Sequence, residues 1–258
     1  MANTASDVRV RLATPEEYGK IAEISMLSFA NDPLLNYLVG ATEPFDMKDS
    51  KAVEARMALQ SFFVNAVAIN EGRITVVVDE RENIRAGCLW LPPQRRLSKW
   101  DVQGLYNAGM LSVLQKCGLG TYRRIFSDYE APSEVSTKEC YKACGSKESP
   151  MDSWYLQITF THPEHQGKKY LSLLLREAFA YAPDCAFTLE STTPRSRDRY
   201  EHLGFEARLF RSKPTLIIIG KGKANAKGLP ASGEDATGLE SWAMVKWPSV
   251  KKDEESSA

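Results

Sequence analysis

The strongest constraint on the fold of this chain comes from residues 154–180, which read WYLQITFTHPEHQGKKYLSLLLREAFA. Residues 154–161 are apolar enough for a central strand, and apolar side chains recur at helical spacing from Leu171 to Phe179. Residues 166–169 form a polar turn between them. Such a turn presents several backbone N–H groups at the start of a helix, so it is suited to an anion such as the pyrophosphate of a nucleotide or of coenzyme A.

The rest of the chain alternates between strand and helix patterns. Strands are expected at residues 8–12, 74–79, 86–91, 186–190, 205–211 or 215–219, and 241–247, with helices opening at Thr14-Pro15, Ser50 and Thr193-Pro194. Residues 94–151 form an insert that is expected to be helical over 99–117, 121–129 and 133–144. This order predicts an α/β fold, with one mixed sheet covered by helices on both faces.

The expected domain organisation is a single domain over residues 8–248, between a flexible N-terminus at 1–7 and a disordered charged tail at 249–258. Residues 220–240 are rich in glycine and lysine. They lack the Gly-Lys-Ser/Thr ending of a phosphate loop and a following helix, so a flexible hairpin connection is the better interpretation.

Composition excludes several function classes. The formal net charge of the 258 residues is zero, so no global field attracts nucleic acid or an anionic membrane. The longest apolar runs are too short to span a bilayer, and the N-terminal sequence lacks a signal core, which predicts a cytoplasmic protein. The five cysteines are scattered and odd in number, which favours reduced thiols and no metal site.

Two groups of residues resemble the GNAT superfamily of N-acetyltransferases, in particular its larger fungal members. The first is Trp154-Tyr155-Leu156 with Thr161-His162-Pro163 and Gln166-Gly167-Lys168, and the second is Leu189-Glu190-Ser191-Thr192-Thr193-Pro194-Arg195 with Tyr200-Glu201-His202-Leu203-Gly204-Phe205. Residues 220–223 with Trp242-Ala243-Met244 resemble the closing hairpin of the fungal members. The resemblance covers residues 8–248 and implies a mixed, largely antiparallel central sheet with the insert at 94–151 added to it.

The resemblance also implies a site for acetyl-CoA, which serves as a substrate. Two parallel strands splay apart in this fold, and the pantetheine arm pairs with the exposed strand edge, here at Phe160 and Thr161. The pyrophosphate lies on the turn, and the later helix adds a further contact. The implied cofactor-binding residues are Phe160, Thr161, Gln166, Gly167, Lys168, Lys169, Tyr170, Leu171 and Ser196. Tyr200 is implied as the acid that protonates the departing thiolate.

Several of these positions depart from the family pattern. Lys169 and Leu171 stand where the family has glycine or alanine, and Ser196 stands where an asparagine is common. A lysine does not easily adopt a positive φ, and a leucine can fill the space that a cofactor would use. These departures make the use of acetyl-CoA doubtful.

Three hypotheses for the function follow. The first is an acyltransferase that moves an acetyl group from acetyl-CoA to the amine of a small molecule, without nucleic acid or membrane partners. The alternative is a repurposed enzyme of a secondary-metabolite pathway that catalyses isomerisation or cyclisation by acid/base chemistry. The third is a non-catalytic binding protein. Glu190, at the end of a predicted strand, is the candidate general base, either directly or through water, and Tyr200 is the candidate acid.

Overall fold

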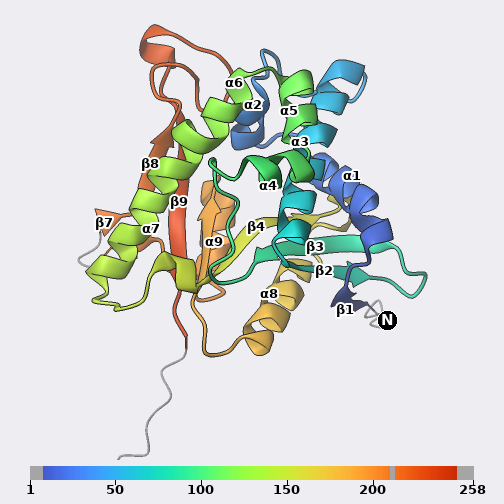
Figure 1. The fold of residues 1–258 in the computed structure, drawn as a ribbon, viewed down its shortest axis with the longest axis vertical. Coiled ribbons are helices and arrows are strands. Elements are labelled where there is room, and N and C mark those ends of the chain that lie inside the picture. The colour runs from blue at the N-terminus through green and yellow to red at the C-terminus, as the bar shows by residue number, and fades with distance from the viewer. Residues whose placement is uncertain (1–7, 210–212, 249–258) are drawn as a thin grey trace, which may run out of the picture.

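The computed structural model describes residues 8–209 and 213–248, so the expectations for the two termini lie outside the described residues. A seven-stranded sheet has the order β1-β2-β3-β4-β5-β9-β8 (Figure 1). Its only parallel pair within the described residues is β4–β5, so the sheet is mixed and largely antiparallel, as predicted. The strands are β1 Arg9–Leu12, β2 Arg73–Val78, β3 Ile84–Leu91, β4 Trp154–Thr161, β5 Phe187–Ser191, β8 Leu216–Ile219 and β9 Leu239–Lys246. Two further short strands, β6 Arg208–Leu209 and β7 Lys213–Pro214, pair with each other.

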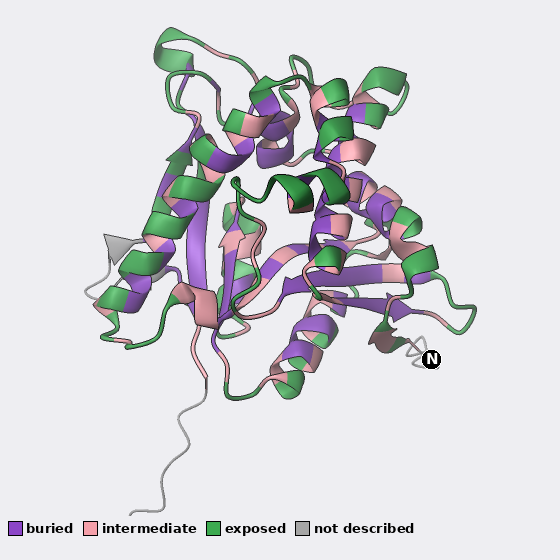
Figure 2. Cartoon of the chain, viewed as in Figure 1, coloured by how far each residue is buried: buried purple, intermediate pink, exposed green. Residues whose placement is uncertain are grey.

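Helices cover both faces of the sheet, as expected. One face carries α1 Tyr18–Ser28, α2 Pro33–Val39, α3 Ser50–Ile69 and the helices of the insert, and the other face carries α8 Tyr170–Tyr181 and α9 Pro194–Glu201. Each face has its own hydrophobic cluster, and β2, β3, β5 and β9 are mostly buried between them, whereas β1 and alternate residues of β4 and β8 are more exposed (Figure 2). The apolar stripe predicted for residues 171–179 forms the inner side of α8 and packs against the cluster on its face.

The insert differs from its expected division into helices. The predicted helix 99–117 is broken at Gly109, whose φ of +100° ends α4 Val102–Ala108 before α5 Met110–Cys117 begins. The predicted helix 121–129 is a short α6, Gly120–Arg123, followed by a π-helical stretch, Arg124–Glu130. That stretch continues without a break into α7 Ala131–Ala143, which lies across β8 and β9 (Figure 1).

The connection at 220–240 joins β8 to β9 as a hairpin, as predicted. It also packs against α2, because the Asn36 side chain donates a hydrogen bond to the Lys227 carbonyl at 2.9 Å. Of the two strands considered for this part of the chain, β8 belongs to the main sheet and β6 is only a short piece of the separate pair.

Helix α3 is long and apolar enough to cross a membrane by length and composition alone. The sequence analysis did not identify it as such a segment. Half of its most apolar window is buried inside the structure, and Leu59, Phe62 and Val67 belong to the hydrophobic cluster on its face of the sheet. A core helix satisfies the same criteria, so this feature is weak evidence for a membrane span.

Candidate functional site

The central feature of the site is an opening between β4 and β5. The two strands pair at Trp154–Phe187 and Tyr155–Thr188, and beyond these pairs none of the described residues forms a strand partner for β4 on that side. We call this opening the strand fork. At its narrow end the pairing of β4 with β3 skips Gln157, so that Leu156 packs on the α8 face while Ile158 packs on the α3 face. This β-bulge bends β4 at the point where the strands separate.

The turn between α1 and α2 connects both strands at the wide end of the fork. The Ser28 hydroxyl lies 2.8 Å from the Thr161 carbonyl of β4 and 2.8 Å from the Ile24 carbonyl of its own helix, so the two carbonyls share its one hydrogen. The Thr192 hydroxyl after β5 donates to Asp32 at 2.8 Å. Asp32 also caps α2 by accepting from the Leu35 N–H at 3.0 Å. The Thr161 carbonyl, which was expected to face the pantetheine arm, therefore already has one partner.

A buried arginine holds this turn in place from α3. Arg56 is 1% exposed, and its guanidinium donates to the Phe29 carbonyl at 3.1 Å and to the Asn36 side chain. The Phe45 ring lies beneath it, 4.7 Å from the ring centroid to the guanidinium carbon. Desolvation lowers the pKa of Arg56, and the charge of Asp32 acts in the opposite direction. Sequence reasoning did not identify Arg56 or Asp32 as part of the site.

The turn before α8 is open to an anion. Gly167 and Lys169 both have positive φ, +83° and +63°, and residues 166–169 are exposed. Within the described residues, no acceptor binds the backbone N–H groups of residues 167–171. Tyr170 is buried, and Leu171 packs against the cluster under the sheet instead of standing in the turn. The Leu171 side chain therefore does not fill the space in front of these N–H groups.

Positive charge surrounds the same turn. The two ring nitrogens of His165 face Arg85 and Lys168, at 2.7 and 3.0 Å. Desolvation, followed by the charges of Arg85 and Lys168, lowers the pKa of His165. The possible ligand atoms of His162, Glu164 and His165 lie within 4.8 Å of one another, a spacing that a metal ion requires. Arg85 is ion-paired with Asp79, and both His165 ring nitrogens already face a cationic donor, which opposes a metal there.

Glu190 lies on the α3 face of the fork, in contact with two tyrosines. Its Oε2 accepts hydrogen bonds from the hydroxyls of Tyr155 at 2.6 Å and Tyr129 at 3.3 Å. Desolvation raises the pKa of Glu190, although the tyrosine hydrogen bonds act in the opposite direction. Glu130, the next residue after Tyr129, is exposed. We call Glu190, Tyr129 and Tyr155 the Glu190 cluster.

Arg96 holds Tyr155 in its position. Its guanidinium donates to three backbone carbonyls, those of Pro92, Arg95 and Ser153, at 2.8, 2.8 and 2.9 Å. The same group lies 5.1 Å from the centroid of the Tyr155 ring. Arg96, Tyr155 and Tyr129 were missed by the sequence analysis, since only the folded chain brings them to Glu190.

The structure separates the two predicted catalytic residues. Tyr200 is 6% exposed and packs in the α8-face cluster, which includes Leu156 of β4 and Leu189 of β5. Burial raises its pKa strongly. Tyr200 therefore lies under both strands of the fork on the α8 face, whereas Glu190 lies on the α3 face. Ser196, in the first turn of α9, shares hydrogen bonds with Ser191 and Thr193 at 2.7 Å.

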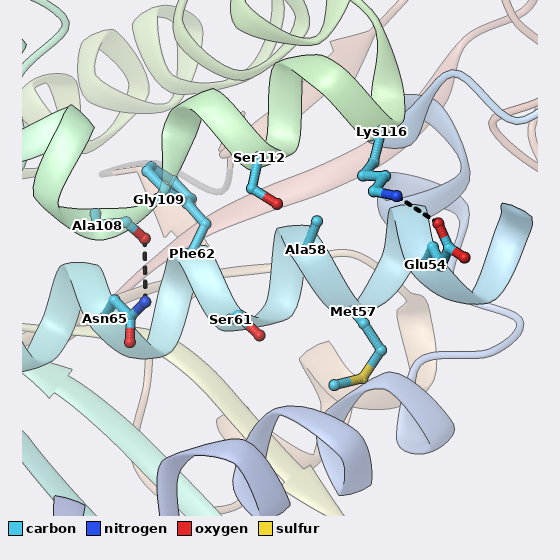
Figure 3. A pocket seen from close by; sticks show the side chains of 10 residues that line it. All are labelled: Glu54, Met57, Ala58, Ser61, Phe62, Asn65, Ala108, Gly109, Ser112 and Lys116. Atoms are coloured by element: carbon cyan, nitrogen blue, oxygen red, sulfur yellow. Dashed lines mark hydrogen bonds and ion pairs between the residues drawn. The ribbon is translucent and has the colours of Figure 1, made fainter.

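A separate hollow of about 440 Å³ lies between α3 and the α4–α5 pair (Figure 3). An ion pair between Lys116 and Glu54 at 2.6 Å closes one end, and Asn65 donates to the Ala108 carbonyl at 3.2 Å at the other (Figure 3). No member of the Glu190 cluster lines this hollow.

The sequence matches no protein-family model, and it matches none of the curated proteins. Solved structures of acetyltransferases share its fold along nearly the whole chain. A histone acetyltransferase HPA2 and related acetyltransferase from Corynebacterium glutamicum is 23% identical, with a TM-score of 0.52, and the match covers 95% of this chain and 98% of that one. Arylalkylamine N-acetyltransferase 2 from Aedes aegypti is 14% identical, with a TM-score of 0.55 and coverages of 94% and 100%. The polyamine N-acetyltransferase of Drosophila melanogaster, which forms N-acetylagmatine, is 14% identical, with a TM-score of 0.55 and coverages of 93% and 99%. The chain has the GNAT acetyltransferase fold that its motifs predicted.

Proposed function

We propose that this protein transfers an acetyl group from acetyl-CoA to the amine of a small molecule. The observation that carries the proposal is the strand fork, whose unpaired β4 edge connects the Glu190 cluster with the free N–H groups of residues 167–171. An acceptor amine and an anionic acyl donor could therefore meet along one strand. Two acetyltransferases of similar fold are named for amine substrates, an arylalkylamine and a polyamine, which supports the same class of reaction for this protein.

The residues at the fork fit acetyl-CoA with one restriction. The free N–H groups at the start of α8, with Lys168 and Lys169 beside them, suit the pyrophosphate. The β4 edge beyond Tyr155 offers backbone groups to the pantetheine amides. Ser28 already donates to the Thr161 carbonyl, but a carbonyl oxygen has two lone pairs and can accept a second hydrogen bond.

The two titratable groups divide the proton transfers between the faces of the fork. On the α3 face, the Glu190 carboxylate accepts a proton from the acceptor ammonium, and the amine nitrogen then bonds to the thioester carbonyl carbon. As the carbon–sulfur bond breaks, the thiolate takes a proton from the α8 face, where Tyr200 is the candidate donor. The amine nitrogen gives up its second proton to solvent, and the Tyr200 phenolate is reprotonated from solvent. Desolvation raises the pKa of Glu190 and so makes its carboxylate a stronger base. It also raises the pKa of Tyr200, which makes that phenol a weaker acid.

Calorimetric titration with acetyl-CoA and with free coenzyme A tests the proposal. We expect binding that Lys168→Ala weakens several-fold, through the loss of one charge beside the turn. Lys147→Ala, at an exposed lysine in the loop after α7, is the matched control and should leave binding unchanged. No heat of binding at millimolar ligand would overturn acetyl transfer.

A second candidate is an acid/base enzyme that does not use acetyl-CoA. It is favoured by the hydrogen bonds that the α1–α2 turn makes to both strands at the wide end of the fork. It is also favoured by the Glu190 cluster, where a desolvated carboxylate and two phenols already lie on one face. This candidate predicts that the protein gives no heat with either coenzyme A species.

A further inference from the structure

A buried hydroxyl without a partner lies beside Glu190. Ser241 of β9 is 0% exposed, and its hydroxyl makes no hydrogen bond within the described residues. Glu190 of β5 lies opposite Ala243 of β9, and Ser241 faces the same side of the sheet two residues closer to the wide end of the fork. The Cα atoms of such diagonal neighbours lie about 7–8 Å apart. Ala243 borders both residues with only a methyl group, so no large side chain of β9 separates them.

The inner face of α7 brings a second free hydroxyl to the same level. The stretch before α7 contributes a tyrosine to the Glu190 cluster, and at the other end of the helix Tyr141 packs in a cluster with Val245 of β9. From Val245 back to Ser241 the strand spans about 13 Å, and from Tyr141 back to Ser133 the helix spans about 12 Å. Ser133 is 4% exposed, and its hydroxyl also has no hydrogen-bond partner among the described residues. The two free hydroxyls therefore lie at one level of the interface between α7 and β9, next to Glu190.

The surroundings of the two serines suit an uncharged polar group. The buried residues of α7 carry no charge; they are Ser133, Thr137, Cys140 and Tyr141. A second ammonium there would be buried without a counter-charge, which is costly. A hydroxyl donates one hydrogen bond and accepts others, so one ligand hydroxyl can pair with both serines. Glu190 is only partly buried, so a ligand that reaches it from solvent can carry such a group to them.

We infer that Ser241 and Ser133 determine specificity for an acceptor amine that carries a hydroxyl group about three to five carbons from its nitrogen. This inference rests on the proposed function and adds the group by which the acceptor is recognised. The amine reacts at Glu190, while the hydroxyl accepts a hydrogen bond from one serine and donates one to the other. An alkylamine of the same length reaches Glu190 but leaves both serine hydroxyls unpaired.

The test compares α,ω-amino alcohols of three to five carbons with alkylamines of the same lengths, by acetyl transfer and by calorimetric binding without acetyl-CoA. At least one amino alcohol should exceed its matched alkylamine in kcat/KM by about tenfold or more, because the alkylamine leaves buried hydroxyls unpaired. Ser241→Ala and Ser133→Ala should each lower that ratio several-fold. Ser127→Ala, at an exposed serine before α7, is the matched control and should leave the ratio unchanged. Urea denaturation shows whether each variant is folded.

The two arms separate this inference from the proposed function. Equal kcat/KM for amino alcohols and alkylamines would overturn the inference and leave acetyl transfer standing. So would a preference that both serine variants retain, which is the result expected if a bound water pairs the two hydroxyls. If no amine is acetylated, the binding arm decides: an amino alcohol that binds more tightly than its alkylamine, and loses this advantage in Ser241→Ala, supports the inference. Equal or absent binding overturns it, and titration with acetyl-CoA decides acetyl transfer separately.

Discussion

Replacing Lys169 by glycine should stabilise the protein. Lys169 precedes α8 with φ of +63° and ψ of +20°, in the left-handed region. A residue with a Cβ pays about 1–2 kcal/mol there, whereas glycine pays no such penalty but loses about 0.5–1 kcal/mol more in chain entropy on folding. Lys169→Gly should therefore raise the free energy of unfolding by up to about 1.5 kcal/mol, with a central value of about 0.75 kcal/mol. For a domain of this size the central value corresponds to a rise in Tm of about 1.5–3 °C.

Lys168→Gly is the matched control. It removes the same charge from the adjacent position, where φ is not positive. It should lower the free energy of unfolding by about 0.5–1 kcal/mol. Urea denaturation and thermal melting of both variants give the comparison, and acetyl-CoA titration shows whether the two lost charges weaken binding alike. If Lys169→Gly is no more stable than Lys168→Gly, the left-handed lysine is not strained and the reasoning fails.

Four further outcomes follow from the site. Glu190→Gln should lower kcat by about 10²–10⁴-fold, because the amide cannot accept the proton. The wild-type rate should rise with pH through an inflection above the ordinary glutamate pKa. Desolvation raises the pKa of Glu190, and only its carboxylate form accepts the proton. Arg56→Ala should cost about 3–5 kcal/mol of stability in urea denaturation, because it removes a buried charge that holds the α1–α2 turn. Ser28→Ala should lower stability by about 1 kcal/mol yet tighten acetyl-CoA binding in a calorimetric titration, because it frees the Thr161 carbonyl. Tyr200→Phe should lower kcat for acetyl transfer more than Tyr155→Phe, which steady-state kinetics would show.

The parts of the fold that depend on local pattern could be predicted from the sequence. Residues 154–180 form the strand, turn and helix that their apolar spacing indicated. The strand packs against a hydrophobic cluster on each of its faces, and the apolar side of the helix packs against one of these clusters. The insert was predicted less well. Gly109, with a positive φ, breaks a sequence pattern that predicted one continuous helix. The residue types at 124–130 do not distinguish a π-helix from an α-helix.

The candidate site depended on contacts that no local pattern contains. Tyr129 and Tyr155 lie 61 and 35 residues from Glu190 in the chain, so their hydrogen bonds form only when the π-helical stretch 124–130, β4 and β5 come together. A tyrosine in an amphipathic segment looks the same whether it packs in a core or binds a carboxylate. Arg56 could not be predicted for the same reason. The apolar spacing of its helix predicts a buried face, but it does not show that a charged side chain lies on that face.

The positions of the acid and the base on opposite faces of the sheet distinguish the two enzymatic hypotheses. A proton cannot pass directly from Glu190 to Tyr200 across the fork, because the two side chains belong to different faces of the sheet. Acetyl transfer needs no such passage, since the base acts on the amine and the acid acts on the sulfur, on two sides of one carbonyl carbon. An isomerase moves a proton between two atoms of one small molecule, and it would use Glu190 with Tyr155 and Tyr129, which share one face. A catalytic requirement for Tyr200 therefore favours acetyl transfer, and a requirement for the tyrosines of the Glu190 cluster alone favours isomerisation.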